Sequence, residues 1–120
     1  MTFLFAILLA AAAPAGPPPR AGQCRWVHGR FSVWNGSSVQ RIWVIGTRRI
    51  VALRDEDPNV PPEIRRYEAG AAEYRGRDVD GLSGEFYICA RENGRPGHMQ
   101  HVRLLQTRYL RFRGRPFPGR

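Results

Sequence analysis

The side chains best suited to binding chemistry are arginines and tryptophans in the first half of the chain. Guanidinium groups pair bidentately with carboxylates and phosphates, and indole rings offer a flat surface for cations and stacking partners. Such a set could bind an anionic glycan or a lipid headgroup. The alternative is that the tryptophans lie in the core or in half-buried strands and the arginines form a solvated face. The candidate binding residues are Trp26, Arg30, Trp34, Arg41, Trp43, Arg48 and Arg49.

Three histidines are the weak candidates for a metal site. His98 and His101 are three positions apart, a spacing that shares a face on a helix but not on a strand. Because the surrounding residues favour a strand, we expect surface or turn histidines here. A metal site with His28 as a third ligand stays the alternative.

No residue pattern in the chain is typical of a catalytic centre. Ser37, Ser38 and Ser83 lie in ordinary turn contexts without a nucleophile-elbow motif. The carboxylates at 55–57 and at 78 and 80 are expected to be solvated loop charges. The sequence therefore predicts a protein that is not an enzyme and has no cofactor.

Charge is distributed unevenly along the chain. All 19 basic residues are arginine, there are 10 acidic residues, and the formal net charge is +9. Residues 1–54 and 93–120 each hold seven arginines and no acid, whereas residues 55–92 hold all the acids. A basic surface attracts polyanions. Because an arginine bias with many Gly and Ala residues is also typical of GC-rich genomes, composition alone leaves open whether the charge is functional.

Residues 1–15 have the pattern of a secretory signal peptide. Residues 3–13 form an apolar run of 11 residues, which is too short for a membrane-spanning helix of roughly 20 residues and suits a signal sequence. Small residues at 13 and 15 predict cleavage before Gly16. The usual basic residue near the start is missing, so either the amino terminus alone supplies the charge or the true start lies upstream. A buried N-terminal helix or strand is the alternative.

Export would place the two cysteines in an oxidising compartment, where we expect Cys24 and Cys89 to form a disulfide. The bridge would close a loop of 64 intervening residues, worth about 4 kcal/mol in the chain-entropy model. The mature protein is then expected to be periplasmic or secreted, without a transmembrane segment.

The rest of the chain predicts one domain with two irregular flanks. Residues 16–23 form a Pro/Gly linker with nothing to bury, and residues 24–110 form a single β domain. Residues 111–120 have no periodicity and are predicted to be a disordered Arg/Phe tail.

Apolar patterning predicts five strands, at residues 25–34, 42–45, 50–53, 85–91 and 98–106. In the first strand Val27, Phe31 and Val33 share one face, and in the fourth Phe86, Ile88 and Ala90 do.

The connections carry turn and helix signals. Gly46-Thr47 predicts a type II′ hairpin turn, with a longer loop over 46–49 as the alternative. Pro62 predicts the first turn of a short helix that continues through residues 63–68. The expected fold is mostly β: a small antiparallel β-sandwich or partly open barrel of about five strands with one short helix.

A set of residues lies in a fixed order along the chain: Cys24, His28-Gly-Arg-Phe31, Trp34-Asn-Gly36, Arg41-Ile-Trp43, Gly46-Thr-Arg48, Gly84-Glu-Phe86, Cys89 and Pro96-Gly-His-Met-Gln100. In this order, over about residues 24–105, the chain resembles small exported proteins of uncharacterised function from Gram-negative proteobacteria. The resemblance implies no activity. It implies that the Asn-Gly turn, the Ile-Trp strand and the two cysteines belong to the architecture.

The functional prediction is a non-catalytic exported β domain that binds an anionic envelope component. The expected partners are anionic polymers or lipids of the envelope, or another envelope protein, and not nucleic acid. Two alternatives stay open: a structural or accessory subunit that pairs with another envelope protein, and a weak metal-binding protein.

Overall fold

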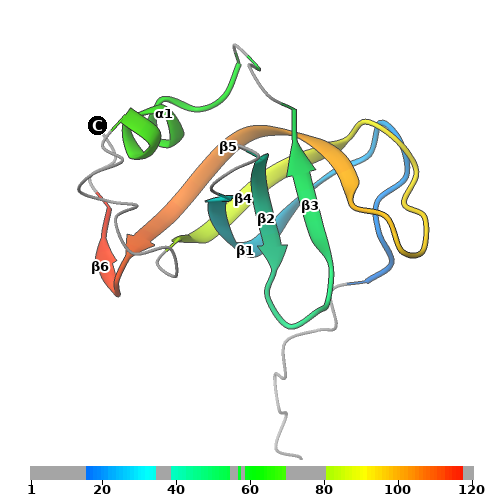
Figure 1. Ribbon diagram of the computed structural model, residues 1–120, viewed down its shortest axis with the longest axis horizontal. Coiled ribbons are helices and arrows are strands. Elements are labelled where there is room, and N and C mark those ends of the chain that lie inside the picture. The colour runs from blue at the N-terminus through cyan, green and yellow to red at the C-terminus, as the bar shows by residue number, and fades with distance from the viewer. Residues whose placement is uncertain (1–15, 35–38, 55–56, 58, 70–80, 118–120) are drawn as a thin grey trace, which may run out of the picture.

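The described part of the computed structural model comprises residues 16–34, 39–54, 57, 59–69 and 81–117 (Figure 1). The predicted signal peptide lies outside these residues. The elements are β1 (Cys24–Trp34), β2 (Val39–Val44), β3 (Ile50–Leu53), α1 (Pro62–Ala69), β4 (Leu82–Ala90), β5 (Gln100–Phe112) and β6 (Arg115–Pro116).

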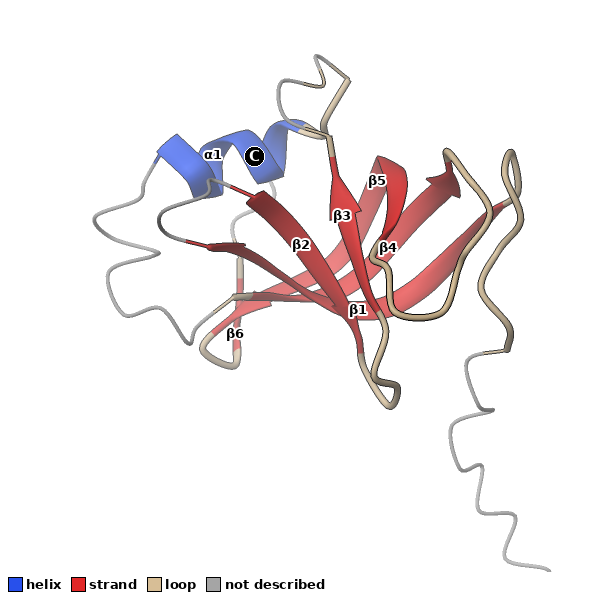
Figure 2. Cartoon of the chain, turned by 45° about the vertical axis from the view of Figure 1, so that its right-hand side comes forward, coloured by secondary structure: helices blue, strands red, loops and turns tan. Residues whose placement is uncertain are grey.

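Five strands close into a barrel, and β6 is added at the outer edge of β5. The order is β3-β2-β1-β4-β5-β6, and β3 also pairs with β5. That closing ladder is parallel, with Val51 opposite Gln100, whereas the other ladders are antiparallel. Figure 2 shows the strands wrapped around a common interior, with α1 against one end. The mostly β barrel is confirmed, but the parallel ladder was not predicted from the sequence.

Period-2 alternation decides which side chains face the interior. On β1, Phe31 is completely buried, and Val27 and Val33 pack against the core. On β4, buried and half-buried residues alternate along the whole strand, with Phe86 and Ile88 inside. The predicted inner faces of both strands are confirmed. The strands begin earlier than predicted, at Cys24 and Leu82.

The β2–β3 connection is the longer of the two predicted loops. The amide of Val44 donates to the carbonyl of Arg49 at 2.9 Å, and the amide of Thr47 donates to the carbonyl of Val44 at 3.1 Å. Gly46 is the third residue of the Val44–Thr47 turn and has a φ of 85°, which type II turns require at that position. The two-residue type II′ turn is therefore wrong, because Gly46 supplies its positive φ one position later.

Helix α1 covers one end of the barrel with an aromatic contact set. Ile64 and Tyr67 are its buried residues. The ring of Tyr67 lies 5.9 Å from that of Phe31 and 6.1 Å from those of Phe112 and Phe117. Because residues i and i+3 share a face on a helix, a single turn suffices to close this end. The predicted helix is confirmed, with Pro62 in its first turn.

The C-terminal segment corrects the sequence prediction of a disordered tail after residue 110. β5 continues to Phe112, and residues 115–116 pair back onto residues 111–112. The amide of Phe117 donates to the carbonyl of Leu110 at 2.9 Å, and the Phe117 side chain is buried. The hairpin is held to the core by the Phe117 side chain, which packs beside α1. The segment around Phe117 has no periodicity, so the sequence did not predict this contact. Residues 118–120 lie outside the described residues.

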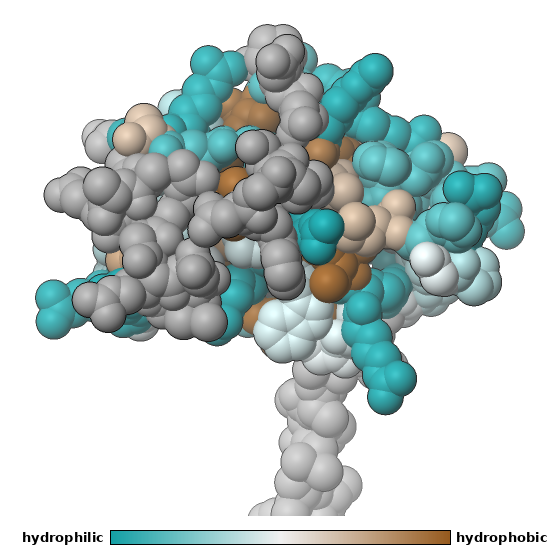
Figure 3. Space-filling model, in the orientation of Figure 1, coloured by the Kyte–Doolittle hydropathy of each residue, from teal (hydrophilic) through white to brown (hydrophobic). Residues whose placement is uncertain are grey.

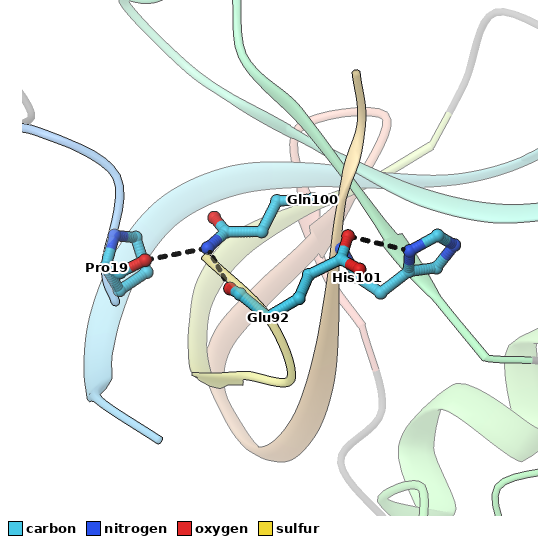
Figure 4. A network of polar contacts seen from close by, with 4 residues as sticks. All are labelled: Pro19, Glu92, Gln100 and His101. Carbon is cyan, nitrogen blue, oxygen red and sulfur yellow. Dashed lines mark hydrogen bonds and ion pairs between the residues drawn. The ribbon is translucent and has the colours of Figure 1, made fainter. Parts of the chain in front are cut away.

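The supposed linker over residues 16–23 is also corrected: it crosses the other end of the barrel as a strap. Pro19 is buried, and the side-chain amide of Gln100 donates to the carbonyl of Pro19 at 2.7 Å and to that of Glu92 at 2.8 Å (Figure 4). The Ala21 amide donates to the side chain of Asn93 at 2.9 Å. Among the described residues, Gln100 is the polar residue that is buried in the core. Its hydrogen bond to Pro19 attaches the strap to the barrel, so the strap belongs to the domain.

A disulfide joins Cys24 and Cys89, as predicted, with a Cα–Cα distance of 4.0 Å. The two residues are direct partners in the β1–β4 register. The bridge therefore fixes the start of β1 immediately after the strap. A stable disulfide is typical of an oxidising, extracytoplasmic environment.

Within the described residues, no helix has both the length and the apolar character that a membrane crossing demands.

Candidate functional site

The outer wall of β1 and β2 brings three of the predicted binding residues together. Arg30 is directly opposite Trp43 in the antiparallel register, and Ser32 is opposite Arg41. Directly opposed residues have Cβ atoms about 5 Å apart, and diagonal neighbours are about 7–8 Å apart. Arg30, Trp43 and Arg41 therefore form one contiguous group, which we call the Arg–Trp strip.

Trp43 is the exposed aromatic residue of this strip. Its side chain is 40% exposed, and its indole Nε1 donates to the carbonyl of Thr47 at 2.7 Å. This hydrogen bond satisfies the polar atom of the ring within the β2–β3 loop. The ring is thus held in one orientation, with apolar surface open to solvent.

Arg30 lies against a glycine. Its Cγ lies 2.8 Å from where a Cβ on Gly81 would be, and the carbonyl oxygen of Phe31 lies 2.1 Å from the same point. A side chain at position 81 would clash with both atoms, so only glycine fits there. The sequence carries no local signal for this contact, because Gly81 is 51 positions away.

The remaining predicted residues lie around the strip. Arg48 is exposed and Arg49 half-buried on the β2–β3 loop. Trp34 pairs with Val39 at the opposite end of the β1–β2 ladder, and its side chain lies outside what the structure describes.

Trp26 belongs to a different cluster. It lies on the same face of β1 as Arg30, but about 13 Å away along the strand. Its ring is 5.2 Å from that of Tyr87, and the guanidinium of Arg108 lies over it at 3.9 Å from the ring centroid. Arg108 is held in turn by Glu85, Nε to Oε1, at 2.5 Å. One face of Trp26 is therefore occupied, and the structure does not bring Trp26 to the Arg–Trp strip.

Sequence reasoning missed Tyr87, Arg108 and Tyr109. The alternation of β4 could have identified Tyr87 as outward-facing. The same count fails for Arg108 and Tyr109 on β5, because the β4–β5 ladder contains a register shift opposite Gly84. Tyr109 lies in this irregularity with a φ of 56° and is 74% exposed. A bulge re-aims a side chain, and no period-2 count on the sequence reveals one.

A basic pocket lies beyond the strip, between the β2–β3 and β4–β5 loops. Its volume is about 570 Å³, within the usual range for small-ligand sites. No Asp or Glu is among its lining residues, which are Pro18, Arg48, Arg49, Ile50, Val51, Gly94, Arg95, Pro96, Gly97, His98, Met99 and Gln100. Figure 3 shows one face of the molecule, on which hydrophobic residues (brown) and residues of intermediate hydropathy (pale) are exposed among hydrophilic ones (teal).

The carboxylates of the described chain all have partners within it. Asp57 pairs with Arg91 at 3.0 Å, and Glu85 pairs with Arg108. Glu68 accepts a hydrogen bond from Gln40 and Glu63 accepts one from Thr107, while Glu92 contacts His101. The described residues hold sixteen arginines against these five acids. The positive charge is therefore in excess on the folded surface as well as in the composition.

The three histidines do not form a cluster. His98 lies in the β4–β5 loop, His28 on β1, and the Nδ1 atom of His101 is 3.0 Å from Glu92 (Figure 4). The side-chain hydrogen bond with His101, followed by a bond from the His101 amide, lowers the pKa of Glu92 below its usual value of 4.5. Among the described residues no three His, Cys, Asp or Glu side chains are grouped for metal binding.

The strand order defines the class of barrel. Three hairpin-connected strands, β1 to β3, are followed by β4, which returns to lie beside β1, and this is a Greek key. Five-stranded Greek-key barrels of this kind are OB folds, which bind oligosaccharides and oligonucleotides on the face of strands 2 and 3 and on nearby loops. The architecture of the described chain is that of an OB-type barrel.

No protein-family model, curated protein or solved structure matches this chain. The resemblance to small exported proteobacterial proteins stays a prediction. Because a fold alone does not define a ligand, a functional conclusion has to come from the side chains of the site.

Proposed function

We propose that this protein is a non-catalytic, exported OB-type barrel that binds an anionic glycan of the cell envelope along the Arg–Trp strip. The observation that carries the proposal is the pairing of Arg30 with Trp43 on neighbouring strands, with Arg41 diagonal to Arg30. An exposed aromatic ring with arginines at neighbouring positions on the same face of the sheet can provide stacking surface and bidentate anion recognition together.

The surroundings of the strip support an extended, negatively charged ligand. The strip lies on the β2 wall that OB-type barrels use for oligosaccharides, and the basic pocket continues it past Arg48 and Arg49. Since oligonucleotides bind the same face of other OB folds, compartment is the argument for a glycan: a disulfide-bonded exported protein meets envelope polymers and not chromosomal DNA.

Retention of the oxidised protein on immobilised lipopolysaccharide tests the proposal. We expect binding that weakens steeply with added salt, because surface charge pairs are screened. We expect R30Q/R41Q and W43A each to weaken binding by about tenfold, corresponding to about 1.4 kcal/mol. The matched control is R103Q/R111Q, which removes the same charge from exposed positions on β5 and should change binding less than twofold.

Three outcomes would overturn the proposal. Equal losses for the strip and control variants would show that net charge alone attracts the polymer. Tighter binding to a single-stranded oligonucleotide, or to phosphatidylglycerol vesicles, that R30Q/R41Q abolishes would assign the strip to another class of ligand. Complete lack of retention at low salt would remove the binding function.

A specific observation favours a second candidate, pairing with another envelope protein. Tyr109 is 74% exposed on a bulge, with the Arg108 guanidinium 5.6 Å from its ring centroid, and Tyr and Arg are enriched at interface hot spots. Cross-linking in intact cells should then yield an adduct that Y109S abolishes while Y109F retains it. A protein that stays monomeric and without adducts contradicts this candidate.

A further inference from the structure

A second pocket lies between the first half of β1 and the β2–β3 loop, and it shares Arg49, Val51 and Gln100 with the basic pocket. Its volume is about 460 Å³. The strap forms one wall through Gly16 and Pro19. The residues that line the pocket are Gly16, Pro19, Arg25, Trp26, Val27, His28, Val44, Ile45, Gly46, Arg49, Val51, Ile88 and Gln100.

The composition of this pocket is amphipathic. Aliphatic residues, namely Val27, Val44, Ile45, Val51 and Ile88, provide much of the lining. Arg25, Arg49 and His28 are its charged or titratable lining residues, and no Asp or Glu is among them. A concave apolar site with a few convergent polar groups is the usual form of a small-molecule site.

The two arginines already bind oxygen atoms on the strap. Arg25 donates from NH1 to the carbonyl of Pro17 at 2.8 Å, and Arg49 donates to the carbonyl of Gly16. These acceptors belong to consecutive residues, so both guanidinium groups bind the same short segment of the strap. A carboxylate or phosphate accepts stronger, charge-assisted hydrogen bonds than a neutral carbonyl does, and it can therefore replace the strap oxygens.

We infer that this pocket binds a single-chain anionic amphiphile, with the acyl chain between β1 and the β2–β3 loop and the anionic head on Arg25 and Arg49. The aliphatic walls exclude a hydrophilic sugar, and the paired arginines select for a negative head. The site is distinct from the Arg–Trp strip and does not depend on the glycan proposal.

Titration with decanoate below its micelle concentration tests this inference, with NMR shifts of the Val27 and Ile88 methyl groups as the readout. We expect saturable shifts at both methyls. Decanol and butyrate should bind at least tenfold more weakly, because one lacks the charge and the other lacks the chain. Decyl phosphate is the second anionic probe and distinguishes a phosphate head from a carboxylate head.

Separate variants test how the pocket binds the anionic head and how it binds the acyl chain. R25Q/R49Q should weaken decanoate binding about tenfold or more, and R48Q is the matched control, because Arg48 is on the same loop but does not line this pocket. I45W places a large side chain in the pocket and should abolish binding, and V27F provides a second filling variant should I45W fold poorly. R30Q/R41Q should leave decanoate binding intact, which keeps this test independent of the glycan experiment.

The inference is overturned when decanol binds as tightly as decanoate, or when R48Q weakens binding as much as R25Q/R49Q does. It is equally overturned when neither anionic probe shifts the Val27 and Ile88 methyl groups.

Discussion

The side-chain amide of Gln100 donates a hydrogen bond to the carbonyl of Pro19 at 2.7 Å, across 81 positions of sequence. The same amide nitrogen donates to the carbonyl of Glu92 at 2.8 Å. One buried side chain thus satisfies two backbone acceptors and holds the N-terminal strap against the barrel end. Residues of the strap line both pockets, so the stability of this contact bears directly on the shape of both.

We expect Gln100→Leu to destabilise the fold by about 1–3 kcal/mol, because two carbonyl groups lose their donor in a buried setting. Urea unfolding gives the magnitude, and faster hydrogen exchange at the Ala21 amide would show that the strap is released. The matched control is Gln106→Leu on the exposed side of the same strand. Equal effects of the two substitutions would contradict the role of Gln100 in holding the strap against the barrel.

Removal of the Cys24–Cys89 bridge should cost about 4 kcal/mol, because the crosslink spans 65 positions and restricts the unfolded chain. The double variant C24S/C89S and the reduced wild-type protein should unfold at similarly lowered urea concentrations. Reductant should leave the midpoint of the double variant unchanged. A wild-type midpoint that does not respond to reductant would argue against the entropic role of the bridge.

Substitution of Phe117 tests whether the end of the chain belongs to the core. Phe117→Ala should destabilise the protein by about 3 kcal/mol, since it removes a buried aromatic side chain in contact with Tyr67. Arg115→Ala alters the same hairpin at an exposed position and should have little effect. Were residues 111–117 disordered, both substitutions would be neutral.

Glu92 should titrate at an acidic pH below its usual value of 4.5, because the hydrogen bond to His101 lowers the pKa of this carboxyl group. A carboxylate whose pKa is lowered on folding stabilises the native state above its unfolded pKa. That contribution is lost as the pH falls through the lower, folded pKa.

Carbon-detected NMR titration of the Glu92 carboxyl group provides the measurement. His101→Ala should move the pKa of Glu92 upward toward 4.5, and His98→Ala, which changes a histidine in the neighbouring loop, should not. A Glu92 pKa that is the same in wild type and His101→Ala would show that the contact has no electrostatic consequence.

The inner faces of β1 and β4 and helix α1 could be predicted because each depends on local periodicity. Val27, Phe31 and Val33 follow the two-residue repeat of a strand, and Pro62 is a local helix signal. The Arg–Trp strip was predicted in part: Arg30, Arg41 and Trp43 share a face only because the β1–β2 register aligns Arg30 with Trp43.

Other features had no local signal. Trp26 is covered by Arg108 from β5, and no pattern near residue 26 indicates a partner so distant in sequence. Tyr109 faces outward because a bulge interrupts the period-2 repeat. The strap and the C-terminal hairpin each contain one buried residue, Pro19 and Phe117, within segments whose composition is typical of disorder.

By itself the sequence determined the strand-rich fold class, the excess of arginine and the availability of two cysteines, because composition and short-range periodicity act over a few residues. Only the tertiary structure decided that β3 and β5 close the barrel, that Arg108 covers Trp26, and that the strap lines two pockets. Those features arise from contacts between residues far apart in sequence, for example 49 positions for Val51 and Gln100 and 81 for Pro19 and Gln100, for which the geometry of the closed sheet, and not any local preference, selects the partner.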